Sequence, residues 1–246
     1  LGFITQATLH IVPAPQAVET AFLSFPDALS ASKGAEAVFS KGYLPSTMEL
    51  LDRKSLEAVR SVSPFRFPEN IGAALLIESD GIPEMAQQDL YRICEIAGEV
   101  GASDSVVARN EKERQAMRRA RQLVSSSLKE KYPLKISDDI AVPRSQMAVL
   151  MEYAQEEAAK ENITFACYGH IGDGNLHVNL LCGVDDLSKA QGVRIKLMQK
   201  AVAMQGTISG EHGIGIHKRD MLSLEQSQEL IDLQKRLKGI FDPQGL

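Results

Sequence analysis

The chain has 246 residues, of which 44% are hydrophobic and 24% charged, and its formal net charge is -5 at pH 7. This length is enough for one large domain or two small ones with a real hydrophobic core. The charge forms no basic stripe, and no apolar run approaches the roughly 20 residues of a membrane-spanning helix, so we expect neither nucleic-acid binding nor a transmembrane segment. Three cysteines inside apolar runs indicate buried thiols rather than a disulfide framework. These features predict a soluble, intracellular protein of the cytoplasm.

The first half of the chain predicts a scaffold. Residues 3–12 alternate apolar and polar side chains up to two prolines, which predicts a strand that leaves an earlier domain through a stiff linker. The pattern that follows predicts a βαββαβ unit of the ferredoxin-like type, in which an antiparallel sheet is flanked by helices. Strands are expected over 20–25, 46–51, 73–78 and 105–109, and helices over 26–41, 55–62 and 83–100. The predicted fold class is therefore α+β.

The second half, after residue 111, is also rich in strands and helices and could echo the first, but the sequence shows no internal repeat strong enough to assert. Helices are expected over 111–128, 144–160, 186–204 and 224–239, and strands over 134–142, 163–167 and 176–182. On the first of these helices, Arg121 and Ser125 are four residues apart and share a face, where they could hold a carboxylate. The alternative is that the arginines of this helix are ordinary solvated surface.

Two stretches, residues 167–179 and 206–215, are rich in glycine. Four of the chain's five histidines lie in or near them. His170 and His177 are an odd number of residues apart, so on one straight strand they would face opposite ways. The glycines around Asp173 permit a tight bend that brings both imidazoles to one side. We interpret Asp173 as a turn residue, with a ligand role as the minority alternative.

Two imidazoles suit a divalent transition metal such as zinc or manganese, and one carboxylate would complete a set of three ligands with open positions. Glu211 is the best-placed carboxylate, and its neighbour His212 could then act as a general base beside the metal. The competing interpretation is that these histidines are satisfied core residues. No dinucleotide fingerprint, Walker A sequence or nucleophile elbow is present.

Four segments of the sequence resemble a known family. They are residues 169–177 (GHIGDGNLH), 210–215 (GEHGIG), 1–5 (LGFIT) and 241–243 (FDP). The family comprises FAD-linked oxidases of the vanillyl-alcohol-oxidase type, specifically the C-terminal domain of the glycolate oxidase subunit, D-lactate dehydrogenase and D-2-hydroxyglutarate dehydrogenase group. The resemblance covers nearly the whole chain. It implies a substrate or cap domain over 16–240, with 1–15 ending a preceding FAD-binding domain and 241–246 leading back to it.

The resemblance also implies roles for single residues. Metal ligands would be His170, His177 and Glu211, and the catalytic base would be His212. Substrate contacts would be Arg121, Ser125, Lys135 and Asn179, of which Lys135 is the least securely matched. Members of the family often carry Trp three residues before the position of Arg121, where this chain has Arg118.

The function implied is that of a substrate- and metal-binding domain in an FAD-dependent D-2-hydroxy acid dehydrogenase, with D-lactate or glycolate as the expected substrate. The cofactors implied are FAD, held mainly by another domain, and a divalent metal, Zn or Mn. The partners implied are the small D-2-hydroxy acid, an electron acceptor or partner subunits, which could place the protein at the periphery of the inner membrane, and a second copy in a homodimer. The alternatives are a metal-dependent hydrolase and a non-catalytic cap or subunit-contact domain.

Overall fold

The structure is a computed structural model that describes residues 4–245. Its chain divides into two compact units. One unit is the continuous stretch Pro15–His212, and the other combines the described residues before Pro15 with those after His212. The larger unit contains all the strands of the sheet and every candidate site residue named above.

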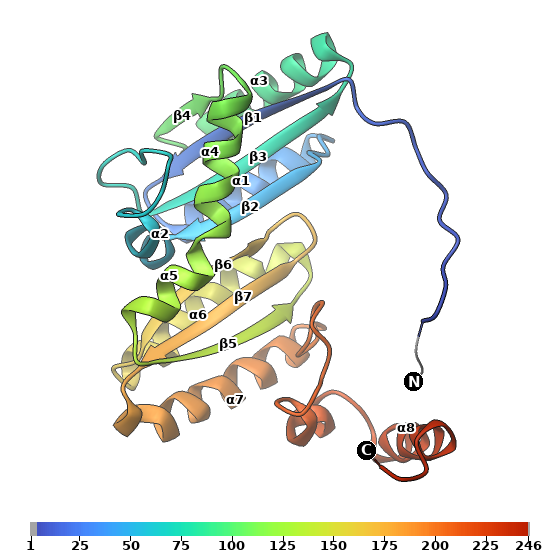
Figure 1. The fold of residues 1–246 in the computed structure, drawn as a ribbon. Helices are drawn as coiled ribbons and strands as arrows, with labels where there is room; N and C mark the ends of the chain where they lie inside the picture. Colours follow the sequence, from blue (N-terminus) through green and yellow to red (C-terminus); the bar gives the residue numbers. More distant parts are fainter. Residues whose placement is uncertain (1–3, 246) are drawn as a thin grey trace. The chain divides into compact units, whose positions relative to one another are not determined.

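The larger unit is organised around one seven-stranded antiparallel sheet (Figure 1). Its strands are β1 (Ala17–Phe25), β2 (Thr47–Asp52), β3 (Ala73–Gly81), β4 (Asp104–Val107), β5 (Leu134–Ala141), β6 (Thr164–His170) and β7 (Asn175–Cys182). The spatial order is β4-β1-β3-β2-β6-β7-β5. The α+β class with an antiparallel sheet flanked by helices is therefore confirmed.

The first four strands form the predicted ferredoxin-like unit. Their order, β4-β1-β3-β2, results from two split βαβ crossovers, through α1 (Ala28–Ser40) and α3 (Pro83–Glu99). The short helix α2 (Arg53–Val59) follows β2, and the side chain of Asp52 caps its N-terminus by accepting from the Ser55 N–H.

The second half repeats this arrangement in reduced form. Strand β5, helix α6 (Met147–Lys160), strand β6, strand β7 and helix α7 (Leu187–Ala203) follow the same βαββα order, and β7 lies between β6 and β5 as β3 lies between β2 and β1. A single antiparallel bridge, Ala141 to Thr207, occupies the place of a fourth strand beside β5. The two halves thus have related topologies, which the sequence had not been sufficient to assert, and β2 pairs with β6 to join the two half-sheets.

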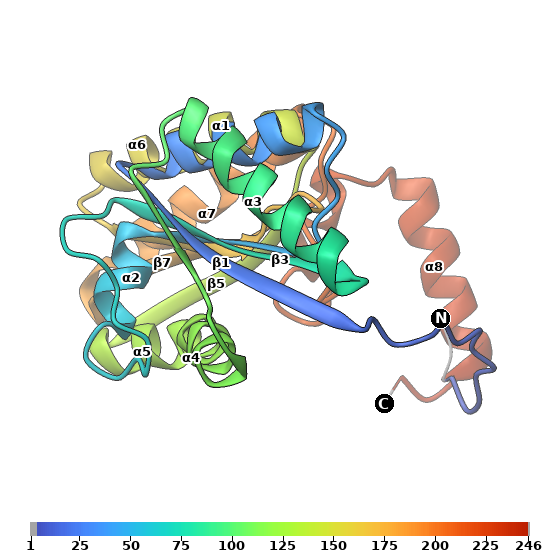
Figure 2. The ribbon, with the colours of Figure 1, turned by 90° about the horizontal axis from the view of Figure 1, so that it is seen from above.

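Helices cover both faces of the sheet (Figure 2). Helices α1, α3, α6 and α7 lie on one face, and α2 lies on the other with α4 (Glu111–Gln122) and α5 (Val124–Lys131). The second face carries a buried apolar cluster to which Met117, Val124 and Leu128 contribute from the helices and Phe22 and Leu181 from the strands. The candidate site residues of β6 and β7, His170, His177 and Asn179, point to this second face, which also carries Arg121 of α4 and Ser125 of α5.

Four sequence predictions require correction. Residues 4–12 form neither helix nor strand, because no described strand pairs with this alternating segment; Phe3 lies outside the described residues. The helix expected over 111–128 is broken at Leu123, which ends α4 and precedes α5. Residues 144–146 form a 3-10 turn before α6, and the last helix, α8 (Gln228–Phe241), starts after a 3-10 segment, Arg219–Leu224. Apolar periodicity continues through such breaks, so it does not reveal them.

Among the described helices, none is both long enough and apolar enough to cross a membrane.

Candidate metal centre

The hairpin of β6 and β7 places both predicted histidine ligands on one face of the sheet. In its register, Tyr168 lies opposite His177 and His170 lies opposite Asn175. Residues that are directly opposite in an antiparallel pair point to the same face, as do residues two apart in one strand. Both imidazoles therefore project together, as the glycine-rich bend between them predicted.

The bend itself depends on a turn residue and a glycine. The Asp173 side chain accepts a hydrogen bond from the Asn175 N–H (Oδ1 to N 3.1 Å), so Asp173 acts as a turn residue. Gly174 has a φ of +86°, and a Cβ there would lie 2.2 Å from the Val142 carbonyl oxygen. Only glycine fits this position, because both the backbone conformation and the close approach exclude a side chain.

The second glycine-rich loop is attached to the sheet by Asp139 of β5, which lies opposite His177. Its Oδ2 accepts from the backbone N–H groups of Glu211 and His212, both at 2.7 Å. Gly210 passes so close to β7 that a Cβ would lie 2.5 Å from Asn175 Oδ1. The carboxylate of Asp139 and the missing side chain at Gly210 thus bring the Glu-His pair beside the hairpin.

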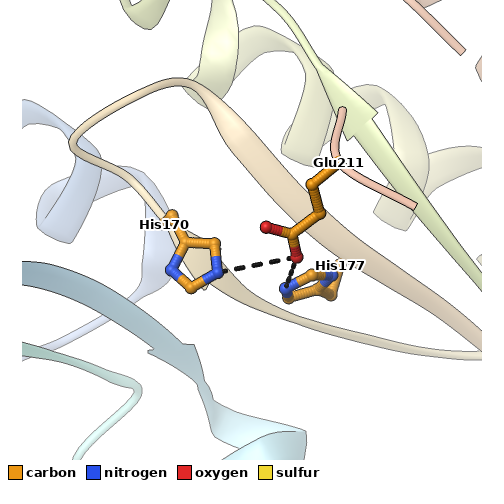
Figure 3. A group of neighbouring side chains, drawn as sticks. All are labelled: His170, His177 and Glu211. Carbon is orange, nitrogen blue, oxygen red and sulfur yellow. Dashed lines mark ion pairs between the residues drawn. The ribbon is translucent and has the colours of Figure 1, made fainter. Parts of the chain in front are cut away.

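His170, His177 and Glu211 converge on one point (Figure 3). Each offers a ligand atom, and the three atoms lie within 4.8 Å of one another. Glu211 Oε1 is 3.5 Å from His177 Nε2 and 3.8 Å from His170 Nε2, separations that leave room for an ion between them. Two imidazoles and one carboxylate fit a zinc- or manganese-type ion with open positions for further ligands.

His212 is next to this group and is more exposed than its members. Its Nε2 lies 3.4 Å from Glu211 Oε1, and its ring centroid is 5.8 Å from that of His177. The side chain is 68% exposed, compared with 12% for His177. An accessible imidazole beside a metal centre can accept a proton from a molecule bound there.

The two histidines predicted to be metal ligands, His170 and His177, have opposite electrostatic environments. Burial lowers the pKa of His177 to about 4, and the positive charges of Arg121 and His170 act in the same direction. The pKa of His170 is raised, chiefly by its hydrogen bond to Glu49. Burial alone would raise the pKa of Glu49, but His170 and Arg121 together lower it. His177 is thus a neutral imidazole, the form that binds a metal, at any physiological pH.

The structure places Arg121 near His170, because both contact the carboxylate of Glu49. Its Nε lies 3.0 Å from Glu49 Oε2, and its guanidinium stacks 4.8 Å from the centroid of the Tyr168 ring. Arg121 is in the last turn of α4, and Ser125 is in α5, beyond the break at Leu123. The two side chains therefore belong to different helices and have different hydrogen-bond partners.

The other predicted substrate residues form two groups. Lys135 Nζ donates to Ser125 Oγ at 2.7 Å, and burial together with the charge of Lys129 lowers the pKa of Lys135. Asn179 is on the same face as His177 but is fully buried, and its Oδ1 accepts from Ser137 Oγ at 2.8 Å. The roles of these residues as substrate contacts stay predictions.

Arg118, where the resembled family often has Trp, is engaged in a bidentate ion pair. Its Nε and a terminal guanidinium nitrogen each lie 2.6 Å from an oxygen of the buried Glu78. Thr20 donates to the same carboxylate at 3.0 Å. Glu78 is opposite Thr47 in the pairing of β3 with β2, and Thr47 is two residues before Glu49. Glu78 and Glu49 therefore point to the same face of the sheet and are near neighbours there.

Sequence reasoning missed Glu49 and Asp139, the two carboxylates behind the predicted ligands. Each is a charged residue inside a strand whose neighbours are mostly apolar, which is an unusual place for a charge. That signal marks them as residues with buried partners. Their partners could not be identified because the strand pairings that bring them to the histidines are tertiary.

The fold and the site together define the class. Residues 14–246 match the family described as "FAD linked oxidases, C-terminal domain", and the chain belongs to that family. Among curated relatives, the chain is 31% identical to "Glycolate oxidase subunit GlcD" of Bacillus subtilis and 30% identical to "Probable D-lactate dehydrogenase, mitochondrial" of Danio rerio, in each case over 100% of its length. It covers 53% and 50% of those two proteins, so it spans about half the length of the curated relatives it matches.

Solved structures share the fold at low sequence identity. A substrate complex of p-cresol methylhydroxylase matches 94% of this chain with a TM-score of 0.69 and 10% identity, and 52% of that chain is covered. Alkyldihydroxyacetonephosphate synthase matches 93% of this chain with a TM-score of 0.57 and 12% identity, and 43% of that chain is covered. These similarities establish the fold alone.

Proposed function

We propose that this chain is the substrate- and metal-binding part of an FAD-dependent dehydrogenase that oxidises a small D-2-hydroxy acid, D-lactate or glycolate, to the 2-oxo acid. The observation that carries the proposal is the convergence of His170, His177 and Glu211, with His212 exposed beside them. Family membership and the names of the relatives support the flavin and the hydroxy acid.

The donor set suits the metal in this proposal. His170, His177 and Glu211 would hold a divalent ion, and a bound ion would supply Lewis acidity toward the hydroxyl and carboxylate oxygens of the substrate. FAD, when bound, would supply the acceptor for the hydride from C2.

Residues of the chain supply binding and proton transfer. Arg121, fixed by Glu49, presents its guanidinium for the substrate carboxylate, since its planar donor groups match a carboxylate. His212 accepts the hydroxyl proton, because its imidazole is accessible and its neighbour Glu211 can stabilise the resulting charge. Ser125 and Lys135 form a hydrogen-bonded polar pair suited to the same anionic ligand.

The test is a His212→Ala substitution in the natural full-length protein. Flavin reduction by D-lactate or glycolate should slow by about 10²- to 10⁴-fold, the usual contribution of a general base, while FAD stays bound. The measurement is single-turnover flavin absorbance with a panel of D-2-hydroxy acids, with and without a chelator. His10→Ala is the matched control, because His10 is an exposed histidine outside the larger unit.

Near-normal flavin reduction by the His212→Ala variant would contradict the assignment of the base. Metal-supplemented hydrolysis without any flavin reduction would favour a hydrolase instead. Failure of the wild-type protein both to bind a metal and to reduce flavin with any 2-hydroxy acid would favour a non-catalytic cap.

A further inference from the structure

Glu49 of β2 connects the candidate metal centre to the candidate carboxylate anchor. Its Oε1 lies 2.7 Å from His170 Nδ1, and its Oε2 lies 3.0 Å from Arg121 Nε. The Glu49 side chain is only 13% exposed, so both oxygens are used inside the protein rather than by solvent. The contact with His170 is a directly opposite pair in the short ladder between β2 and β6.

We propose that Glu49 is a positioning residue that fixes the tautomer of His170 for metal binding and, through its other oxygen, holds Arg121 at a fixed distance from the metal centre. This inference rests on the proposed metal function and adds to it a residue outside the ligand set. Glu49 belongs to the first half of the sheet, whereas the two histidines proposed as ligands belong to β6 and β7 of the second half.

The tautomer follows from the donors and acceptors present. An ionised carboxylate only accepts hydrogen bonds, so the His170 Nδ1 that contacts it carries the proton. Neutral imidazole has one proton, which leaves the lone pair on Nε2, the nitrogen that faces Glu211. A carboxylate behind a histidine ligand in this way orients the ring and increases its basicity toward the metal.

Because Arg121 also needs an acceptor, the tautomer of His170 should change when one carboxylate oxygen of Glu49 is replaced by the amide nitrogen of Gln. Its Nε–H must find an acceptor, and Glu49 Oε2 provides one. In a Glu49→Gln variant, the carbonyl oxygen of Gln would turn to Arg121 and the amide NH₂ would face His170. That amide donates to Nδ1, so the proton of the ring would move to Nε2, where it blocks the metal.

The test measures both the tautomer and the metal affinity in the full chain. Long-range ¹H–¹⁵N spectra of metal-free protein labelled at histidine should show His170 protonated at Nδ1 in the wild type and at Nε2 in Glu49→Gln. Zn²⁺ affinity measured by calorimetry should fall by about 10- to 100-fold in Glu49→Gln, as is typical when a partner of a metal ligand is lost. Glu49→Asp, which keeps a carboxylate, should retain the Nδ1 proton.

Glu78→Gln is the matched control. It weakens another carboxylate–arginine pair on the same face of the sheet, between the buried Glu78 and the more exposed Arg118, and no histidine of the described residues forms an ion pair or hydrogen bond with that pair. Its His170 tautomer and Zn²⁺ affinity should equal those of the wild type.

The outcomes separate this inference from the proposed function. At a pH where His170 is neutral, a wild-type ring with its single proton on Nε2, or a Glu49→Gln variant with unchanged tautomer and affinity, would overturn the role of Glu49. The wild-type spectrum needs no variant, so it decides even if Glu49→Gln fails to fold. A wild-type protein that shows the Nδ1 proton but binds no Zn²⁺ would leave the tautomer assignment standing and would refute the metal site of the proposed function.

Discussion

At the scale of single residues, the candidate site contains two histidines, His170 and His177, whose pKa values are shifted by their neighbours. His177 has a pKa of about 4, because it is buried and lies near Arg121 and His170. His170 has a raised pKa, because Glu49 stabilises its charged form. If His170 and His177 bind a metal as proposed, protons compete with the metal at a higher pH for His170 than for His177.

This difference predicts the pH dependence of metal binding. As the pH falls below the raised pKa of His170, one proton competes with the metal, because only neutral imidazole is a ligand. The logarithm of the Zn²⁺ affinity should then fall with a slope of about one per pH unit, and a second proton should compete only near the pKa of His177. Zn²⁺ titration calorimetry across this range checks the slope. A slope near two already at neutral pH would contradict the assignment for His177.

At the scale of elements, the adjacent residues Asp138 and Asp139 of strand β5 point to opposite faces of the sheet and have different hydrogen-bond partners. Asp139 faces the metal centre and accepts from the backbone of Glu211 and His212. Asp138 faces the opposite side, where both of its oxygens pair with Arg194 of α7 at 2.7 and 2.8 Å. One carboxylate positions a loop, and the other connects a helix to the sheet.

We expect Asp139→Ala to weaken metal binding more than it weakens the fold. Removing this carboxylate leaves two N–H groups of the loop without their acceptor, so Glu211 is no longer held beside the histidines. Zn²⁺ affinity should fall by at least about 10-fold. Calorimetry for the metal and urea denaturation for the fold are the two measurements.

Asp138→Ala is the control in the neighbouring position. It breaks the buried bidentate ion pair with Arg194, so the free energy of unfolding should fall by about 3–5 kcal/mol, with Zn²⁺ affinity close to wild type when the protein is folded. Equal losses of metal affinity in both variants would argue against a specific role for Asp139.

At the scale of the larger unit, two ferredoxin-like halves are joined through the pairing of β2 with β6, which involves three residue pairs. Asp52 reinforces this junction: its Oδ1 accepts from the Ser55 N–H at the start of α2, and its Oδ2 accepts from the Cys167 N–H in β6. Ser55 Oγ also donates to the Cys167 carbonyl oxygen, at 3.2 Å. Because Glu49 and His170 meet in the same ladder, the integrity of the site depends on this junction.

Asp52 predicts a pH-dependent stability of the junction. Burial is the main cause that raises its pKa from 3.8 to about 6, although the hydrogen bonds from Ser55 and Cys167 oppose this. The folded protein thus binds the proton more tightly than the unfolded chain, so this contribution to stability is present below about pH 4 and is lost as the pH rises through about 6. The loss is on the order of 3 kcal/mol.

The measurement compares the free energy of unfolding of the wild type with that of Asp52→Ala across this pH range. The difference between the two proteins should change by that amount, because their other carboxylates are the same. Asp27→Ala is the control for the loss of a helix cap, since Asp27 caps α1 at an exposed position. A difference that stays constant with pH would show that Asp52 ionises in the folded protein as it does in the unfolded chain.

The local pattern of the sequence was enough to predict most of the secondary structure and to select the three residues proposed as metal ligands, which lie together in the structure. Alternating and helical periodicities identified the strands of both halves, and the glycines around Asp173 and Gly210 predicted that His170, His177 and Glu211 could meet. These features are local, because turns and periodicities depend on residues close in the chain. The segment 4–12 had the same alternation but forms no strand, since a strand also needs a partner to pair with.

Only the tertiary structure determined which side chains hydrogen-bond to the residues proposed as metal ligands. Glu49 and His170 are separated by 121 residues, and Asp139 and Glu211 by 72, so their contacts depend on strand order and register rather than on any local pattern. In the structure Arg121 forms an ion pair with Glu49, and Ser125 accepts a hydrogen bond from Lys135. The sequence had instead predicted one continuous helix, on which Arg121 and Ser125 would share a binding face. The sequence alone thus identified the groups that can bind a metal. The pairing of β2 with β6 and of β5 with β7 set their orientation, since register is fixed by long-range hydrogen bonding across the sheet.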